Sequence, residues 1–406
     1  MKLAACQRFR PDQAPRGWTV EPVKNRLWLE YGTGLTDGER LSGDYPVFGS
    51  NGQVGLHREH LVEGPGILVG RKGSVGEIHF SEKSFWPIDT VYYVRRLGQD
   101  NWRFLYYLLT YLNLGQLNAA TGVPGLTRRD AHYIFGAFPP PTEAADIATT
   151  LQLADDAVLV AERKLAEAHR LKTALMQQLF TRGIPERHTR FKPTKIGEIP
   201  EEWDLVPLWK LANPVSGIAL NSDRDPKSNP YRYLTVIHVQ RERLDLEDVR
   251  YMELFAQEVR ASLIEVGDIL VVEGHANPAE IGRAALATEQ VSGFAYQNHL
   301  FCVRLQPNVA FNRLFLLGVL NSARVRRHWR ATCNTSSGLN TINRRGLRRL
   351  LIQRPKEDEQ EHVSQMLCAA NDNIAACEGE LTALNQLKRS LLQNLMTGRV
   401  RVVINP

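Results

Sequence analysis

The stretch that decides the architecture is LKTALMQQLFT at residues 171–181, which returns 216 residues later as LKRSLLQNLMT at residues 387–397. The same spacing holds without a gap for pairs toward the N-terminus: Leu165/Leu381, Leu151/Leu367, Glu143/Glu359, Pro139/Pro355, Arg128/Arg344 and Gly122/Gly338. A repeat of this length predicts two copies of one structural unit in a pseudo-twofold arrangement.

Each copy of that stretch ends a long helical pattern that begins just after prolines, the first over about residues 142–181. Apolar residues recur at alternating spacings of four and three, which predicts a coiled-coil seam of about five heptads and a helix roughly 60 Å long. Because the register matches, pairing of the two helices with each other is favoured over two unrelated surface helices. Lys172 and Lys388 interrupt the seam at the same heptad position, where we expect them to set the register. The residues expected to pair the helices are Leu151, Val158, Leu165, Leu175, Leu179, Leu367, Ile374, Leu381, Leu391 and Leu395.

The sequence before each helix is rich in β-branched runs and in Gly, Pro and Asn turns, at 45–52 and 66–73 in the first half and at 234–239 and 267–272 in the second. This mixture predicts an α+β fold with two domains of mixed α/β structure, each followed by a long helix. The two helices are expected to pair as an antiparallel coiled coil. The expected boundaries are 1–141 for the first domain, 142–183 for the first long helix, 184–200 for a basic linker, 201–355 for the second domain, 356–398 for the second long helix and 399–406 for a tail.

The charge distribution indicates an anionic partner. The net charge is +6, and residues 290–356 contain no Asp or Glu but eleven arginines, while residues 101–129 form a shorter acid-free window in the first half. A solvated face usually mixes signs, so such a one-sided block favours contacts with nucleic-acid phosphates. The alternative is a basic surface that serves solubility.

Catalytic signals are missing from the sequence. There is no P-loop, no GxGxxG after a strand, no HExxH and no Asn/Asp-Pro-Pro-aromatic loop of an adenine methyltransferase. We therefore expect no catalytic, cofactor-binding or metal-binding residues in this chain. Five cysteines without a CxxC pair favour a reducing cytoplasm, and no apolar run is long enough to predict a membrane span.

The remaining candidates are residues that contact DNA. Arginine and asparagine suit the edges of guanine and adenine, and small hydroxyl residues beside arginines suit phosphate oxygens. For Asn51 an Asn-Gly hairpin turn is an equal alternative, and the hydroxyl residues also fit helix caps with solvated charge beside them. The candidates are Asn51, Arg71, Lys72, Ser74, Thr121, Arg128 and Arg129 in the first half, and His275, Asn277, Arg283, Ser336, Ser337, Asn340, Thr341, Arg344 and Arg345 in the second.

With this order and duplication, nearly the whole chain resembles the specificity (S) subunit of type I restriction-modification systems. The resemblance rests on YPVFGSNG at 45–52, GDIL at 267–270, the proline-rich helix start with Glu359-Gln360, and the two Leu-Lys-x-x-Leu-x-x-x-Leu helix ends. The first half departs from the family at Glu143-Ala144, where Glu-Gln is usual, which weakens a contact at the helix start.

The resemblance implies a non-catalytic subunit of a system that defends against foreign DNA. It implies two target recognition domains that each read one half of a split double-stranded DNA sequence. The paired helices would act as a ruler for the unread spacer and as docking sites for two methyltransferase (M) subunits, which restriction/translocase (R) subunits then join. S-adenosylmethionine, ATP and Mg would belong to those partners, which methylate adenine and cleave DNA.

Two rival interpretations remain open. An S-like specificity subunit that partners a fused methyltransferase-nuclease would share these features. A coiled-coil scaffold that binds no DNA is the other rival, against which the arginine-rich block argues. A self-contained nuclease is disfavoured by the missing motifs.

Overall fold

The computed structural model describes residues 9–10, 12, 14–117, 125–336 and 339–402. The chain forms two compact units, one of residues 1–163 with 378–406 and the other of residues 164–377. We call them unit 1 and unit 2. Both long helices contribute to both units, so the domain boundaries expected from the sequence stay predictions.

Each unit contains a four-stranded antiparallel sheet of the same design. In both sheets the strand that comes first in the sequence lies at one edge. It pairs with the strand that comes last in the sequence, and that strand also pairs with a short buried apolar strand. The order in unit 1 is β2 (Leu27–Tyr31), β8 (Val91–Arg96), β5 (Gly66–Gly70) and β6 (Ile78–Ser81). In unit 2 it is β13 (Ala212–Ser216), β20 (Leu300–Leu305), β16 (Ile269–Val272) and β18 (Ala284–Leu286).

A three-stranded sheet is also built twice. Its central strand pairs antiparallel with one neighbour and parallel with the other in both units. The strands are β4 (Gly52–His57), β3 (Tyr45–Gly49) and β7 (Trp86–Pro87) in unit 1, and β15 (Arg250–Glu253), β14 (Pro230–Leu234) and β19 (Ala295–Tyr296) in unit 2.

Short antiparallel pairs complete the units. The strand that opens each repeat pairs with the strand directly before the long helix, namely β1 (Thr19–Pro22) with β9 (Phe135–Phe138) and β12 (Asp204–Pro207) with β23 (Leu351–Arg354). Unit 2 adds the hairpin of β10 (Phe191–Thr194) with β11 (Gly197–Pro200), and the sheet of β17 (Gly274–His275), β22 (Leu339–Thr341) and β21 (Asn334–Ser336).

The shorter helices follow the same plan. The apolar helix after the last sheet strand is α2 (Trp102–Leu112) in unit 1 and α6 (Arg313–Asn321) in unit 2, and an asparagine side chain, Asn101 or Asn312, caps each one. The other α-helices are α3 (Arg128–Tyr133), α5 (Ala256–Ser262), α7 (Ala323–Thr332) and α8 (Arg344–Arg349). Single 3-10 turns are η2 (Val23–Asn25), η3 (Asp37–Glu39), η4 (Leu114–Leu117), η5 (Leu208–Lys210), η6 (Ser222–Arg224) and η7 (Glu289–Val291).

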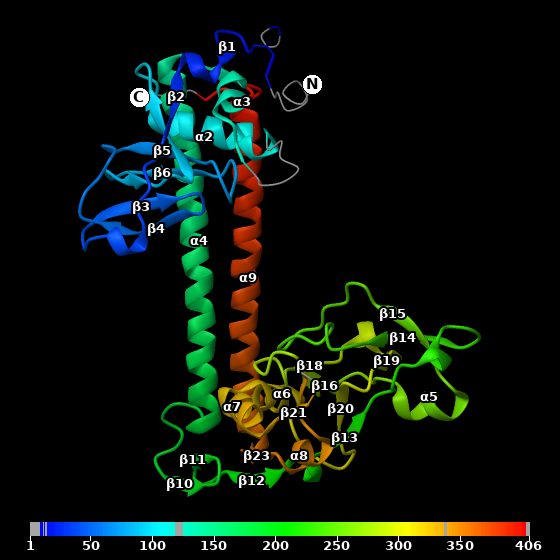
Figure 1. Cartoon of the computed structure of the whole chain (residues 1–406). Helices are drawn as coiled ribbons and strands as arrows, with labels where there is room; N and C mark the ends of the chain where they lie inside the picture. The colour runs from blue at the N-terminus through cyan, green and yellow to red at the C-terminus, as the bar shows by residue number, and fades with distance from the viewer. Residues whose placement is uncertain (1–8, 11, 13, 118–124, 337–338, 403–406) are drawn as a thin grey trace. The chain divides into compact units, whose positions relative to one another are not determined.

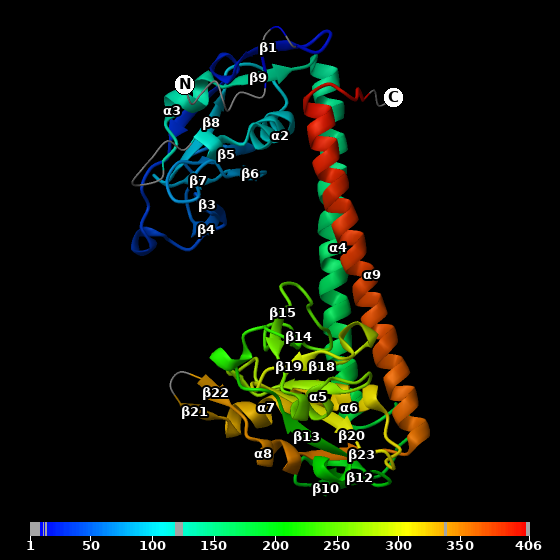
Figure 2. The ribbon, with the colours of Figure 1, turned by 90° about the vertical axis from the view of Figure 1, so that its right-hand side faces the viewer.

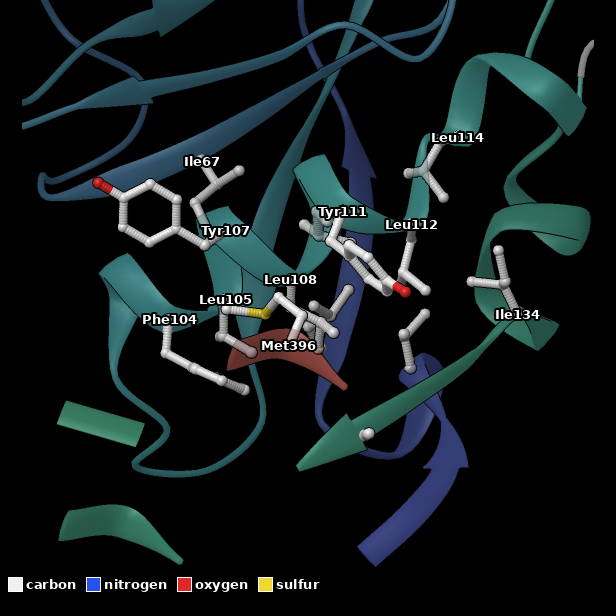
Figure 3. Packing of buried hydrophobic residues seen from close by; sticks show 14 of the residues in the cluster. Ile67, Phe104, Leu105, Tyr107, Leu108, Tyr111, Leu112, Leu114, Ile134 and Met396 are labelled. Atoms are coloured by element: carbon white, nitrogen blue, oxygen red, sulfur yellow. The ribbon is translucent and has the colours of Figure 1, made fainter. Parts of the chain in front are cut away.

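The two long helices are α4 (Pro141–Thr181) and α9 (Glu357–Met396). Within each unit they lie side by side and run in opposite directions (Figure 1 and Figure 2). In unit 1 the start of α4 and the end of α9 share one core with α2, where Met396 lies among Phe104, Leu105 and Leu108 (Figure 3). In unit 2 the end of α4 and the start of α9 share a second core that contains Phe180, Phe315 and Val363. No helix in the described part of the chain has an apolar stretch long enough to cross a membrane.

Most residues expected to pair the helices are buried. Leu151 and Leu395 belong to the core of unit 1, Leu179 and Leu367 belong to the core of unit 2, and Ile374 packs with Leu165 and Ala168. Val158 is also buried, whereas Leu165, Leu175, Leu381 and Leu391 are half-buried. The predicted α+β fold with paired long helices is confirmed.

The β-branched segment 234–239 forms a turn over most of its length. The strand β14 ends at Leu234, and residues 235–238 form a turn instead of continuing it. The buried imidazole of His238 accepts a hydrogen bond from the Thr235 amide at 2.9 Å and so closes the turn. A side-chain acceptor two or three residues away competes with a neighbouring strand for the backbone N–H. β-propensity scales do not include this competition.

A buried glutamate at the start of each long helix holds the tryptophan that opens each repeat. The indole of Trp18 donates to Glu143 at 3.1 Å, and the indole of Trp203 donates to Glu359 at 3.0 Å. Each glutamate also meets an arginine, Arg401 in unit 1 and Arg187 in unit 2, and Glu359 meets the His188 ring as well. These contacts fasten β1 and β12 to the helices that follow their partner strands.

We expect Glu359→Ala to destabilise unit 2 by about 3 kcal/mol, because it leaves the Trp203 indole and the His188 ring without their acceptor in a buried site. Glu359 is 2% exposed, and His188 Nε2 lies 2.7 Å from its carboxylate. Urea denaturation followed by circular dichroism measures the change. Glu357→Ala, at an exposed position of the same helix turn, is the matched control and should change stability by only a few tenths of a kcal/mol. Equal stability of the two variants would contradict the anchoring role.

Candidate nucleic-acid interface

In unit 1 the structure brings two arginines from distant parts of the sequence onto one exposed tyrosine. The guanidinium carbons of Arg71 and Arg128 lie 4.8 and 5.0 Å from the ring centroid of Tyr31, which is 47% exposed. Arg71 follows β5 and Arg128 opens α3, and a backbone hydrogen bond from Leu126 to Arg71 holds the two segments together. Stacking on a ring fixes a guanidinium in place, and the Arg71 guanidinium also donates to the Asp89 carbonyl at 3.1 Å. We call Tyr31, Arg71, Lys72 and Arg128 the first basic patch.

The electrostatics of this patch favour an anion. Burial raises the pKa of the neighbouring Tyr92 phenol, Tyr31 acts in the same direction, and Arg71 and Arg128 oppose them. Lys72 lies 3.8 Å from Asp89, an exposed and therefore weak ion pair that a phosphate can replace. The patch thus presents three cations, two of which stack on the Tyr31 ring.

The hairpin that contains Asn51 adjoins this patch. Ser50 and Asn51 form the two-residue turn between β3 and β4, and Gly52 follows with φ +100°. The Ser50 amide donates to the Thr90 hydroxyl, while the carbonyl of Thr90 accepts from Arg71 and Lys72. The hairpin-turn interpretation of Asn51 is therefore the observed local structure, with the side chain exposed, and its contact with a base stays a prediction.

The other candidates of unit 1 lie around the same two segments. Ser74 is half-buried in the loop after β5, and Arg129 is exposed on α3. The α3 helix is capped by Thr127, whose hydroxyl accepts from the Asp130 amide. Thr121 lies outside the described residues.

In unit 2 four arginines gather around an exposed indole. Arg344, Arg345, Arg348 and Arg349 of α8 line, together with Trp209, a cavity of about 660 Å³. Trp209 is 44% exposed, and Arg344 is held by its hydrogen bond to the Pro214 carbonyl at 2.7 Å. The α8 arginines and Trp209 form the second basic patch. An open hollow of this kind suits phosphates, with an aromatic face for a sugar or a base.

Three candidates of unit 2, His275, Asn277 and Asn340, are joined by hydrogen bonds at β17 and β22. The Asn340 amide donates to the carbonyls of His275 and Ala276 at 3.3 and 2.8 Å, and Asn340 is 9% exposed. His275 in turn accepts from the Asn277 amide at 3.0 Å. Asn340 therefore shapes the 275–277 loop, and the exposed Asn277 lies on it. Thr341 pairs with Gly274 in the same sheet.

Arg283 is 6% exposed. Its guanidinium donates to Glu280 at 2.9 Å and to the Val236 carbonyl at 2.6 Å. Next to it, burial lowers the pKa of Arg241, and the nearby Arg326 acts in the same direction. Contact of Arg283 with DNA stays a prediction. For Ser336 the structure gives only the backbone, in β21, and Ser337 lies outside the described residues.

The described residues contain no group of three or more His, Cys, Asp or Glu side chains placed to hold a metal ion. The four cysteines among them, Cys302, Cys333, Cys368 and Cys377, are free thiols. The candidate side chains carry mainly guanidinium, amide and hydroxyl groups, which bind a partner through hydrogen bonds and charge.

Comparison with known proteins gives a consistent set of relatives. No protein-family model matches the chain. The type I restriction enzyme MjaVIII specificity subunit of Methanocaldococcus jannaschii is 22% identical over 359 residues, which cover 85% of this chain and 81% of that protein. The type I restriction-modification S subunit of M. genitalium superposes with a TM-score of 0.59 at 15% identity, over 96% of this chain and 97% of the other. A chain from a structure of type I system assembly and conformational transition gives 0.60 at 12% identity, over 95% and 99%.

The resemblance to type I specificity subunits is confirmed. The structure also explains the departure at Ala144. In unit 2 the equivalent Gln360 accepts from the Asn312 amide and donates to the Pro355 carbonyl, both at 2.9 Å. Ala144 offers neither group and joins the apolar core instead.

Several residues of the two basic patches were missed by the sequence analysis. Tyr31 and Trp209 are large exposed aromatic residues far in sequence from the arginines that they meet. Arg348 and Arg349 lie in the acid-free window but carry no motif of their own. Interleaved aromatic and basic residues are a known signal of nucleic-acid binding, but here the interleaving exists only after folding.

We expect Asn340→Ala to release the 275–277 loop, because the two carbonyls lose their shared donor. Hydrogen exchange of the backbone amides of residues 275–277 and 279 should accelerate about fivefold, as for the loss of one or two ordinary hydrogen bonds. Asn51→Ala, at an exposed turn of unit 1, is the control and should leave these amides unchanged. Unaltered exchange in Asn340→Ala would show that another contact holds the loop.

Proposed function

We propose that this chain is the DNA-specificity subunit of a type I restriction-modification complex and recognises a bipartite DNA target. The observation that carries the proposal is the duplication: one α/β architecture is built twice, and each copy carries its own basic patch with an aromatic support. Relatives named type I specificity subunits match most of the chain.

Each domain would bind one half-site. Arginines and lysines bind backbone phosphates and position the domain, while loop residues at the groove read base edges. The two patches differ in composition, because the first stacks two arginines on a tyrosine and the second lines a hollow with an indole. Unlike loops on like frameworks support two unlike half-sites.

The paired helices α4 and α9 would act as the spacer between the half-sites and as the docking place for M subunits, which R subunits then join. Methylation and cleavage, with their S-adenosylmethionine, ATP and Mg, would be carried out by those partners. Purification of the assembled complex with a tag on this chain tests this arrangement. It also shows whether the methyltransferase and nuclease functions lie on separate or fused partner chains.

Methylation mapping of genomic DNA tests the function directly. With the gene present, we expect an N6-methyladenine motif in which two short specified parts flank a fixed unread spacer, and we expect its complete loss when the gene is deleted. Restoring the gene is the control. A methylome that does not change on deletion, in cells shown to make the partner subunits, would contradict the proposal.

Removal of charge from the first basic patch should weaken DNA binding. Arg71→Ala with Lys72→Ala should lower the affinity of the assembled complex about tenfold for a duplex with both half-sites, and should reduce the slope of log affinity against log salt by about one to two. Filter binding over a range of salt concentrations measures both. Arg163→Ala with Arg170→Ala removes two exposed arginines of α4 and is the charge-matched control. An equal effect in both variants would mean that only overall charge matters, as expected for a scaffold with no DNA site in the domain.

A further inference from the structure

The lysine of the repeated helix end makes an ion pair in unit 2 that ties three segments together. Lys172 of α4 lies 2.6 Å from the carboxylate of Glu242, and the Asn371 amide of α9 donates to the same carboxylate oxygen at 3.1 Å. Glu242 belongs to the turn after residue 239, so a group of the domain is held by both long helices. The two charged side chains are largely buried, at 19% and 13% exposure. We call Lys172, Glu242 and Asn371 the second clamp.

The backbone at Glu242 is shaped for this contact. Its φ is +63°, a left-handed conformation that side-chain-bearing residues rarely adopt. The Glu242 amide donates to the Ala284 carbonyl at 2.8 Å, and the amide of Gln240 donates to the carbonyl of Arg243 across the turn. A strained residue that is held in place by its surroundings indicates a functional or positional demand. Here the strain directs the carboxylate toward the helix pair.

Unit 1 contains a matching contact with different chemistry. Lys388 of α9 lies 2.5 Å from Asp155 of α4, and the buried Tyr107 of α2 donates its hydroxyl to the other oxygen of Asp155 at 2.7 Å. Again a lysine, a second helix residue and one group of the domain meet at one carboxylate. We call Tyr107, Asp155 and Lys388 the first clamp.

The helix positions of the two clamps are equivalent in the repeat. Lys172 and Lys388 are 216 residues apart, and so are Asp155 and Asn371. The single carboxylate, however, has changed sides. In the first clamp the helix supplies it and the domain supplies a hydroxyl, whereas in the second clamp the domain supplies it and the helix supplies an amide.

We propose that the two clamps are matching codes. The group that each domain supplies suits the helix residue at its own position and does not suit the residue at the equivalent position in the other unit. A domain that brings Glu242 to a helix with aspartate would place two carboxylates against one lysine. A domain that brings the Tyr107 hydroxyl to a helix with asparagine would leave the buried lysine without a counter-charge. Either mismatch is costly in a partly buried site, where water screens the charges only in part, so domain and helix residues must change together. The clamp residues are positioning residues, and they seat the domains whether or not DNA is bound.

The code predicts a specific rescue in the full-length chain. Asn371→Asp should loosen the turn at 239–245, because the new carboxylate meets Glu242 at hydrogen-bond distance with a single lysine between them. Asn371→Ala removes the same hydrogen bond without adding charge and is the matched control. The double variant Asn371→Asp with Glu242→Gln recreates the polarity of the first clamp, with the carboxylate on the helix and a neutral group on the domain.

Hydrogen exchange of backbone amides 239–245 is the measurement, made on the protein without DNA. We expect exchange in Asn371→Asp to be about tenfold faster than in Asn371→Ala, and the double variant to return to the wild-type rate. Amides 102–112 of α2, in the first clamp's unit, should be unaffected throughout and report that the fold is intact. Equal exchange in Asn371→Asp and Asn371→Ala, or failure of Glu242→Gln to restore it, would overturn the code. Because no DNA is present, either result is independent of the proposed function.

Discussion

The contact on which both units depend is the buried carboxylate at the start of each long helix. Glu143 and Glu359 accept from the indoles of Trp18 and Trp203, which open the two repeats. A buried carboxylate is stable only with hydrogen-bond donors and counter-charge, so its site draws in cations from other segments. In unit 1 that cation, Arg401, comes from the chain after α9, and in unit 2 the cation, Arg187, comes from the chain after α4 with the His188 ring beside it. Each glutamate therefore joins the start of one helix, the opening strand of its domain and the segment that follows the other helix, which is possible only where the helices run antiparallel.

The architecture follows from the sequence because its signals are periodic and occur twice. Heptad spacing identifies α4 and α9, prolines mark where they begin, and the constant spacing of the two copies predicts that whatever pairs in one half pairs in the other. The buried strands β5 and β16 are short apolar runs bounded by glycine, which the sequence also shows. Residues 235–238 form a turn within a β-branched run, and there the imidazole of His238 replaces a sheet partner for the Thr235 amide. Local composition cannot register such a side-chain acceptor, since its position depends on the fold.

The candidate site is less accessible to sequence reasoning, because its parts meet only after folding. The acid-free windows contain the first residues of α3 and the whole of α8, which supply arginines to the two basic patches, but they do not point to the aromatic residues beside those arginines. Tyr31 and Trp209 come from strands or turns near the start of each domain, far from Arg128 and Arg344 in sequence. Burial also divides the polar candidates into residues that bind groups of the protein and residues that are exposed, a division that residue type does not predict. Asn340 and Arg283 are engaged with carbonyls and a carboxylate of the protein, whereas Asn51 and Arg345 are exposed.

Duplication explains the form of the differences between the two clamps and between the two basic patches. Two copies that start identical make identical contacts between domain and helices, and the chain ties each domain to the start of the helix that follows it. Divergence at a polar contact must be compensated within the same contact, because a buried charge without a partner costs more than the pair contributes. Lys172 and Lys388 are retained at equivalent positions, and the variable part is the carboxylate that neutralises them, from Asp155 in one unit and Glu242 in the other. Exposed loops are free of this constraint and can diverge singly. The two units therefore share one framework, differ in both partners of each clamp and differ freely in their basic patches. This pattern is expected of a protein that presents two unlike surfaces on one repeated fold.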